Sequence, residues 1–367
     1  MTFSIEINSP RWRNHLSNVL AEFSNAGSAV VPVIKSNGYG LGQDFLASVA
    51  SDLQSAVVAV GTIFEAESLL RSTKADVLVL QPFDPRDEIA CDVWKSLEES
   101  NEGRRIIRVI SSEESFQAVL DIPATPRVIF ECATDLNRFG FRPSEIVKSW
   151  PAIVAAQETA QITIEGITFH FPLTAQNSDT ALIVRTVKQL QEVNAHFVNA
   201  VWVSHLDAKH LQELQAKLSN ITVHSRVGSK LWLGDRDALK TYATVLAVTE
   251  VNRGDVAGYR RKKVPGKGWI ITVAGGTAHG VALSAPSSVA NSRQRAVAFA
   301  SGILESIGAV RSPFSYNGLR LMFLETPHQH VSQLFLPAVN TPPRVGDQLE
   351  VTVRFTTTHA DVVKEIS

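Results

Sequence analysis

The sequence predicts an α/β protein in which a (β/α)8 barrel of the TIM type, over residues 10–235, precedes a β-rich domain. Short and almost wholly apolar segments alternate with longer segments whose apolar residues recur every three or four positions. Apolar runs of the first kind are typical of parallel strands that are buried on both faces. Eight such strands with their helices, over roughly 225 residues, match the size of a (β/α)8 barrel.

The barrel strands follow one another with helical segments between them. We expect strands at residues 30–34, 56–61, 76–83, 105–111, 127–132, 164–171, 201–205 and 221–228. The expected helices include residues 11–27, 64–72, 111–122, 180–197 and 206–219. An open, doubly wound sheet is the alternative, but it usually carries G-x-G-x-x-G after its first strand, and NGYGLG (37–42) does not fit that pattern.

The pattern changes near residue 236, after which strands are separated by glycine, proline and charged clusters. Strands are expected at residues 242–251, 268–276, 330–337 and 347–358, and residues 291–308 have helical periodicity. We therefore predict a smaller β-rich domain, made of residues 236–367 together with residues 1–9.

Composition restricts the partners and the location. The formal net charge of −1 favours neither nucleic acid nor an anionic membrane as a partner. Two cysteines, Cys91 and Cys132, are too few for a disulfide framework and fit a reducing compartment. The first residues lack the pattern of a secretory signal, and no apolar run has the length of a membrane helix. A cytoplasmic protein is the expectation.

Lys35 is the most informative residue of the barrel, because it follows the apolar run VVPVI (30–34) directly. The carboxyl ends of barrel strands carry the active sites of TIM-type enzymes. A lysine in partly apolar surroundings there can have a lowered pKa and become a nucleophile that forms Schiff bases with carbonyl compounds. The alternative is a solvated lysine at a strand end.

The segment KSNGYGLG (35–42) resembles the cofactor-lysine motif of the alanine racemase family, the fold-type III enzymes that use pyridoxal 5'-phosphate. The resemblance implies that Lys35 carries the cofactor as a Schiff base and that Tyr39 contributes to phosphate binding. AVGTIFEAESLLR (59–71) is similar to the family's next conserved region.

Further motifs of the family follow in the same order along the barrel. They are FECATDLNRFGF (130–141), GITFHFPL (166–173), VSHL (203–206) and SRVGSKLWLGD (225–235). The resemblance implies a catalytic role for Arg138, a place beside the cofactor ring for His170, and phosphate binding by Ser204. It further implies that Arg226 faces the pyridine nitrogen and that Gly228 and Ser229 bind the phosphate.

The chemistry that the resemblance implies depends on Arg226. An arginine does not give up its proton, so a pyridine nitrogen opposite it stays unprotonated and the ring is a weaker electron sink. Proton removal and return are then favoured over transamination. We therefore expect an amino acid racemase or epimerase that abstracts the α-proton from a Schiff-base intermediate. Glu131 occupies a position that is a carbamylated lysine in some racemases, and is expected to orient Arg138 through a bidentate pair.

The second acid/base of the family departs from the pattern. Racemisation needs a group on each face of the α-carbon, and the resemblance implies a tyrosine from the β domain of a partner subunit, hence a homodimer. AGGTAHG (274–280), the corresponding stretch, has no tyrosine. Histidine is a competent acid/base near neutral pH, and His328 and His279 are the candidates to replace it, with structural histidines as the alternative.

Two other functions stay open at this point. A D-amino acid aldolase or dehydratase shares the lysine barrel, and His359 with Asp361 resembles the metal pair of D-threonine aldolases. Two ligands are a weak signal, so no metal site is predicted. A relative that binds the cofactor or another ligand without turnover would also explain the missing tyrosine. In all readings the substrate is a small molecule such as an amino acid.

Overall fold

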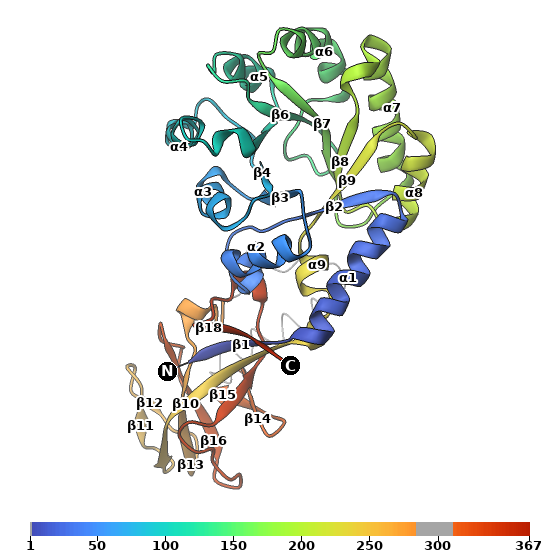
Figure 1. Ribbon diagram of the computed structural model, residues 1–367. Coiled ribbons are helices and arrows are strands. Elements are labelled where there is room, and N and C mark those ends of the chain that lie inside the picture. The colour runs from blue at the N-terminus through green and yellow to red at the C-terminus, as the bar shows by residue number, and fades with distance from the viewer. Residues whose placement is uncertain (1, 284–310) are drawn as a thin grey trace. The chain divides into compact units, whose positions relative to one another are not determined.

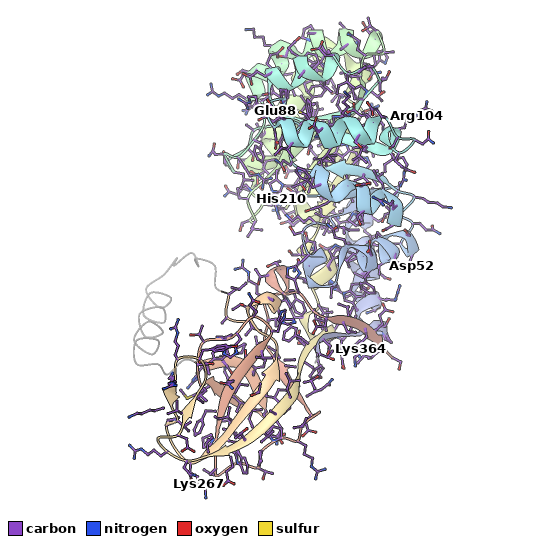
Figure 2. All side chains as sticks on the ribbon, turned by 90° about the vertical axis from the view of Figure 1, so that its left-hand side faces the viewer. Asp52, Glu88, Arg104, His210, Lys267 and Lys364 are labelled. Atoms are coloured by element: carbon purple, nitrogen blue, oxygen red, sulfur yellow. The ribbon has the colours of Figure 1, made fainter. Side chains whose placement is uncertain are left out.

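The computed structural model describes residues 2–283 and 311–367 (Figure 1). The chain divides into two compact units. One contains Arg13–Gly38 and Gln43–Gly234, and the other contains Met1–Trp12, Tyr39–Gly42 and Asp235–Ser367. We call them the barrel unit and the β-rich unit. Charged side chains such as those of Glu88 and Arg104 in the barrel unit lie on the outer surface (Figure 2).

The barrel unit has one sheet of eight parallel strands, which closes on itself as the sequence predicts. The strands are β2 (Ser28–Pro32), β3 (Val57–Val60), β4 (Asp76–Val79), β5 (Ile106–Ile110), β6 (Arg127–Cys132), β7 (Thr163–His170), β8 (Ala200–Ser204) and β9 (Thr222–Val227). Closure occurs between β2 and β3, because Val33 forms a parallel bridge with Ala59, and the amide of Ile34 donates to the carbonyl of Ala59 at 2.7 Å.

Helices alternate with these strands and surround them (Figure 1). They are α1 (Ser9–Asn25), α2 (Gln43–Asp52), α3 (Ile63–Ser72), α4 (Glu88–Glu98), α5 (Glu113–Leu120), α6 (Pro143–Glu158), α7 (Asn177–Val193), α8 (Ala208–Lys217) and α9 (Ser229–Leu233). Local side chains start several of them: Ser112 accepts from an amide of α5, and Asp207 accepts from the amide of His210 in α8. No helix in the described part of the chain is long and apolar enough to span a membrane.

The amino ends of the barrel strands are filled by side chains. Trp202 packs in the apolar interior and stacks on His224, with ring centroids 4.2 Å apart. Arg127, at the start of β6, pairs with Asp76 and with Glu165, each at 2.6 Å. The half-buried ion pairs and the stacked rings occupy this end, and TIM-type barrels carry their active sites at the carboxyl ends.

The β-rich unit is built on an antiparallel sheet around a core that includes Phe3, Ile271 and Phe314. Its strands are β1 (Phe3–Asn8), β10 (Leu239–Val251), β13 (Gly268–Ala274), β14 (Arg311–Tyr316), β15 (Leu319–Phe323), β16 (Val331–Pro337), β17 (Gln348–Val351) and β18 (Val362–Ile366). β10 pairs with β17 and also with β13, so the sheet closes on itself, while β18 is parallel to β1. The hairpin of β11 (Val256–Ala257) and β12 (Lys262–Lys263) stands apart from this sheet.

One strand of the β-rich unit is shorter than the sequence predicts. The strand expected at residues 347–358 ends at Val351, and Phe355–Thr357 form a 3-10 turn. The hydroxyls of Thr357 and Thr358 both donate to the carbonyl of Arg354, so side chains that favour strands here stabilise a turn instead. The helix expected at residues 291–308 lies outside the described residues.

Candidate active site

Lys35 lies three residues beyond β2, at the carboxyl ends of the barrel strands, with its side chain partly exposed. A Cβ atom at Gly61 would lie 3.4 Å from the Cβ of Lys35, so the stem of the lysine packs against the end of β3. Protein atoms around the amine displace water and lower the pKa of Lys35, and Arg138 and Arg226 act in the same direction. Glu65 opposes them, and its carboxylate accepts from the amides of Ser36 and Gly61 at 3.0 and 2.8 Å.

His170 ends β7 and lies beside two residues from the end of β8. Its Nδ1 and the Oγ of Ser204 are 2.6 Å apart, and its ring centroid is 5.3 Å from that of His205. Burial lowers the pKa of His170 to about 3, with help from Arg226 and Arg138. The ring is therefore neutral at physiological pH. Ser204 is buried, and its hydroxyl is engaged with His170.

Arg226 is buried at the end of β9, where its Nη2 donates to the carbonyl of Phe169 at 2.8 Å. Burial lowers its pKa to about 10, against the attraction of Glu131, so the guanidinium stays charged at neutral pH. Its Nε has no hydrogen-bond partner among the described residues. Arg226 therefore has a buried N–H group, on Nε, that can donate a hydrogen bond to a ligand.

Glu131 is also buried, and its Oε2 has no partner in the described part of the chain. Burial raises the pKa of this carboxyl, and Arg226 and Arg138 oppose the rise. Among the described residues no ion pair joins Glu131 to Arg138, so the expected bidentate pair is not formed. Arg138 is exposed, and its guanidinium lies 5.1 Å from the ring centroid of Phe139. Arg138 therefore acts on Glu131 through its charge alone.

Gly228 and Ser229 begin the short helix α9 directly after β9. The amides of Leu231 and Trp232 donate to the carbonyl of Gly228, and the indole of Trp232 donates to the carbonyl of Val33 at 2.8 Å. These bonds fix α9 against the first barrel strand. The exposed Ser229 follows β9, the last barrel strand, and Ser204 ends β8, the strand before it. TIM-type barrels frequently bind phosphate with the loops that follow their last two strands.

A lysine with a lowered pKa, a buried arginine and a neutral histidine thus meet at one barrel end, and comparison with known proteins assigns the family. The family model described as alanine racemase, N-terminal domain, matches residues 7–213, which is more than half of the chain. The chain belongs to the alanine racemase family. Among curated protein sequences, none matches it.

Solved structures agree with this family over the whole length. Alanine racemase from Clostridium difficile 630 is 17% identical, with a TM-score of 0.69, covering 100% of this chain and 96% of that one. The biosynthetic alanine racemase from Pseudomonas aeruginosa is 17% identical, with a TM-score of 0.67, covering 100% of this chain and 99% of that one. Alanine racemase from Bartonella henselae was solved with covalently bound pyridoxal phosphate. It is 16% identical, with a TM-score of 0.68, covering 100% of each chain. Identities at this level show the shared fold.

Tyr39 belongs to the β-rich unit by its contacts. It lies in the 3-10 turn Gly38–Gly40 with φ +55°, and its side chain is buried. A Cβ atom at Gly40 would lie 2.8 Å from the carbonyl oxygen of Phe355, so this glycine lets two segments of the unit approach closely. The phosphate role of Tyr39 stays a prediction.

His279 is buried, and both of its ring nitrogens have partners in the β-rich unit. Nδ1 accepts from the amide of Gly276 at 3.2 Å, and Nε2 lies 3.2 Å from Oδ1 of Asp361. The other oxygen of Asp361 accepts from the amide of Phe3 at 2.8 Å. These contacts tie three segments together and favour a structural role for His279. They also engage the carboxylate of Asp361, which the resemblance to D-threonine aldolases sets beside His359. The described residues contain no cluster of three metal-binding side chains.

His328 lies in a surface groove of about 620 Å³ in the β-rich unit. Its Nε2 is 2.5 Å from the Oε1 of Glu325, which is buried and also accepts from the amide of Tyr259 at 3.3 Å. The ring centroids of His328 and Tyr259 are 4.4 Å apart, and Tyr259 is 83% exposed. Of the two candidate histidines, His328 is the one that reaches an open surface with a carboxylate holding its ring.

Three residues of these sites were not predicted from the sequence: Glu65, His205 and Glu325. His205 follows Ser204 directly, and Glu65 lies in a motif already noted, so the signal was proximity to a strand end. Glu325 precedes His328 by three residues in an irregular segment, where spacing predicts no contact.

Proposed function

We propose that this protein is a pyridoxal-5'-phosphate-dependent amino acid racemase or epimerase, acting as a homodimer on a small amino acid or related substrate. The observation that carries the proposal is the exposed Lys35, whose pKa is lowered, beside the buried Arg226 and the neutral His170. When bound through a lysine, this cofactor supplies an electron sink that makes the substrate's α-proton acidic.

The residues present fit the cofactor. Lys35, Arg138 and Arg226 all influence His170 and His205 electrostatically, which makes this end of the barrel attractive to a phosphate anion. The unpartnered buried Nε of Arg226 is a donor that fits an acceptor nitrogen. Gly228 and Ser229 are proposed to hold the phosphate, with Tyr39, and Ser204 joins them when its hydroxyl proton is not given to His170.

Each residue has a defined task in this proposal. Lys35, with its lowered pKa, is neutral more often than an ordinary lysine, and it moves the α-proton on one face of the substrate. Arg226 keeps its proton and serves as a fixed donor. His170 is held by Ser204 and packs beside the ring as a neutral group. Arg138 is the exposed cation available to a substrate carboxylate.

His328 is proposed as the acid/base for the opposite face, given by the partner subunit. Its bond to Glu325 fixes the ring through Nε2 and leaves Nδ1 as the other site for a proton. His279 is the weaker candidate because both of its ring nitrogens have partners. The missing tyrosine in residues 274–280 favours, as second candidates, an aldolase or dehydratase, or a relative that binds the cofactor without turnover.

The cofactor is tested first. The full-length protein is titrated with pyridoxal 5'-phosphate, reduced with borohydride and digested for mass spectrometry. We expect the label on Lys35, and its absence in Lys35→Ala but not in Lys74→Ala, which removes an exposed lysine elsewhere in the barrel unit. Labelling that is spread over several surface lysines would refute the cofactor proposal.

The reaction is tested next. Both enantiomers of a panel of amino acids are incubated with the loaded protein in heavy water, and α-deuteration and carbonyl products are measured. Racemisation predicts deuterium in both enantiomers, and His328→Asn should slow it by roughly 100-fold or more. The matched control His330→Asn changes an exposed histidine of the same groove. Carbonyl products would favour the aldolase or dehydratase, and no exchange would favour a binding protein.

A further inference from the structure

His205 has a backbone conformation that few residues with a side chain adopt, and histidine is one of the types that adopt it more often. It follows β8 directly, with φ at +64°, in the left-handed region that side chains with a Cβ rarely adopt. A turn without a functional demand would accommodate glycine or asparagine there more easily. Strained residues of this kind cluster at functional sites, where the surrounding structure holds them in place.

The ring of His205 stands among the cationic side chains at the carboxyl ends of the strands. It lies edge-on to His170, at 68° and 5.3 Å between centroids, and the residue is exposed to solvent. Partial burial of the ring among its neighbours lowers its pKa most, and Arg226, Lys35 and Arg138 lower it further. Two carboxylates oppose these three cations: Glu65, which accepts two backbone amides and attracts Lys35, and the buried Glu131, which attracts Arg226. An anion entering this space meets an excess of positive charge.

The neighbouring hydroxyl is less available than the family resemblance implies. Ser204 is buried, and its Oγ lies 2.6 Å from Nδ1 of His170, so it already has a partner. His205 is then the exposed polar side chain at the end of β8. The other loop of a barrel phosphate site, after β9, carries the exposed Ser229.

We propose that His205 binds the phosphate group of the cofactor, by donating an imidazole N–H to a phosphate oxygen. The inference rests on the proposed function and adds a ligand to it. A phosphate dianion also offsets the repulsion that Lys35, Arg138 and Arg226 exert on the ring. Binding of the dianion therefore favours a charged imidazole, which makes a stronger hydrogen bond to phosphate than a neutral one.

The test compares two aldehydes that differ only in the phosphate. Equilibrium dissociation constants of pyridoxal 5'-phosphate and of 5'-deoxypyridoxal are measured by absorbance for the full-length wild type, His205→Ala and His205→Gln. The matched control is His196→Ala, an exposed histidine just before the opposite end of β8. We expect His205→Ala to weaken binding of the phosphate compound by roughly 10- to 100-fold, as for a lost hydrogen bond to a charged group, and binding of the deoxy compound hardly at all.

His205→Gln retains an N–H donor and should lose less affinity than His205→Ala, while His196→Ala should behave like the wild type. Equal losses for both aldehydes in His205→Ala would overturn the inference, because they indicate a general disturbance of the site. Unchanged affinity for both would overturn it as well. If the wild type binds neither aldehyde, the proposed cofactor itself is refuted; if it binds both alike, the phosphate site is refuted while Lys35 chemistry stands.

Discussion

Acidification of the cofactor-free protein should destabilise the barrel unit through the imidazole of His170. Burial, Arg226 and Arg138 lower its pKa to about 3, whereas a histidine in an unfolded chain titrates near 6.5. Below pH 6.5 the imidazole of the unfolded state therefore binds a proton, while that of the folded state stays neutral until the pH is much lower. The stability that the neutral His170 contributes is fully present above pH 6.5 and is lost progressively as the pH falls toward about 3.

The size of the effect follows from the difference between the two pKa values. The difference between a pKa near 6.5 and one of about 3 corresponds to a limit of about 5 kcal/mol in the free energy of unfolding, of which about 2 kcal/mol falls between pH 7 and pH 5. His205 and His224 act in the same direction because burial lowers their pKa values too. The comparison is therefore with His170→Asn, which retains a partner for Ser204 and has no titration.

Two measurements check this reasoning. Urea unfolding at pH 7 and pH 5 should show a loss in the wild type that exceeds the loss in His170→Asn by about 2 kcal/mol. The imidazole resonance that disappears in His170→Asn should show no titration between pH 8 and pH 5 by NMR. A midpoint near 6.5 for that resonance, or equal losses in the two proteins, would refute the electrostatic account of this site.

Three further predictions concern other parts of the chain. Gly166→Ala should lower the free energy of unfolding by roughly 3 kcal/mol or more, measured in urea, because φ is +133° and a Cβ would lie 2.4 Å from the carbonyl oxygen of Ala200. Arg127→Ala should cost about 1–2 kcal/mol in the same assay, since its two half-exposed carboxylate partners lose their cation. Glu325→Gln should slow α-proton exchange by about 10-fold and shift its pH profile, with KM unchanged, if it positions His328; an unshifted profile would leave Glu325 a purely structural partner.

The barrel was predictable because its signals are local. All eight strands lie where apolar runs predict them, within a few residues, and the order of the elements then permits few topologies. The fold of the β-rich unit was harder to predict from the sequence. The pairing of β10 with β13, β17 and β1 joins distant segments, and the strand expected at residues 347–358 fails because hydroxyl groups bond to the local backbone.

The candidate site divides in the same way. The positions of Lys35, His170, Ser204 and Arg226 at one end of the barrel could be predicted from the sequence. Each of these residues lies at or near the end of a strand, and parallel strands bring their carboxyl ends together. The hydrogen-bond partners of the candidate side chains could not be predicted from the sequence. The bond between His279 and Asp361 spans 82 residues, and it changes the interpretation of both.

The charge balance at the carboxyl ends of the strands explains why Lys35 and His205 should respond to the same ligand. Lys35, Arg138 and Arg226 lower the pKa of both His170 and His205, and the two arginines also lower that of Lys35, so the fold holds like charges together at some expense of stability. A bound anion relieves this repulsion. Inorganic phosphate alone should therefore raise the melting temperature of the cofactor-free protein above that in chloride of equal ionic strength, and by less in His205→Ala. Equal melting temperatures in the two salts would mean that the cations are already neutralised, and would remove the electrostatic basis for placing a phosphate at this end of the barrel.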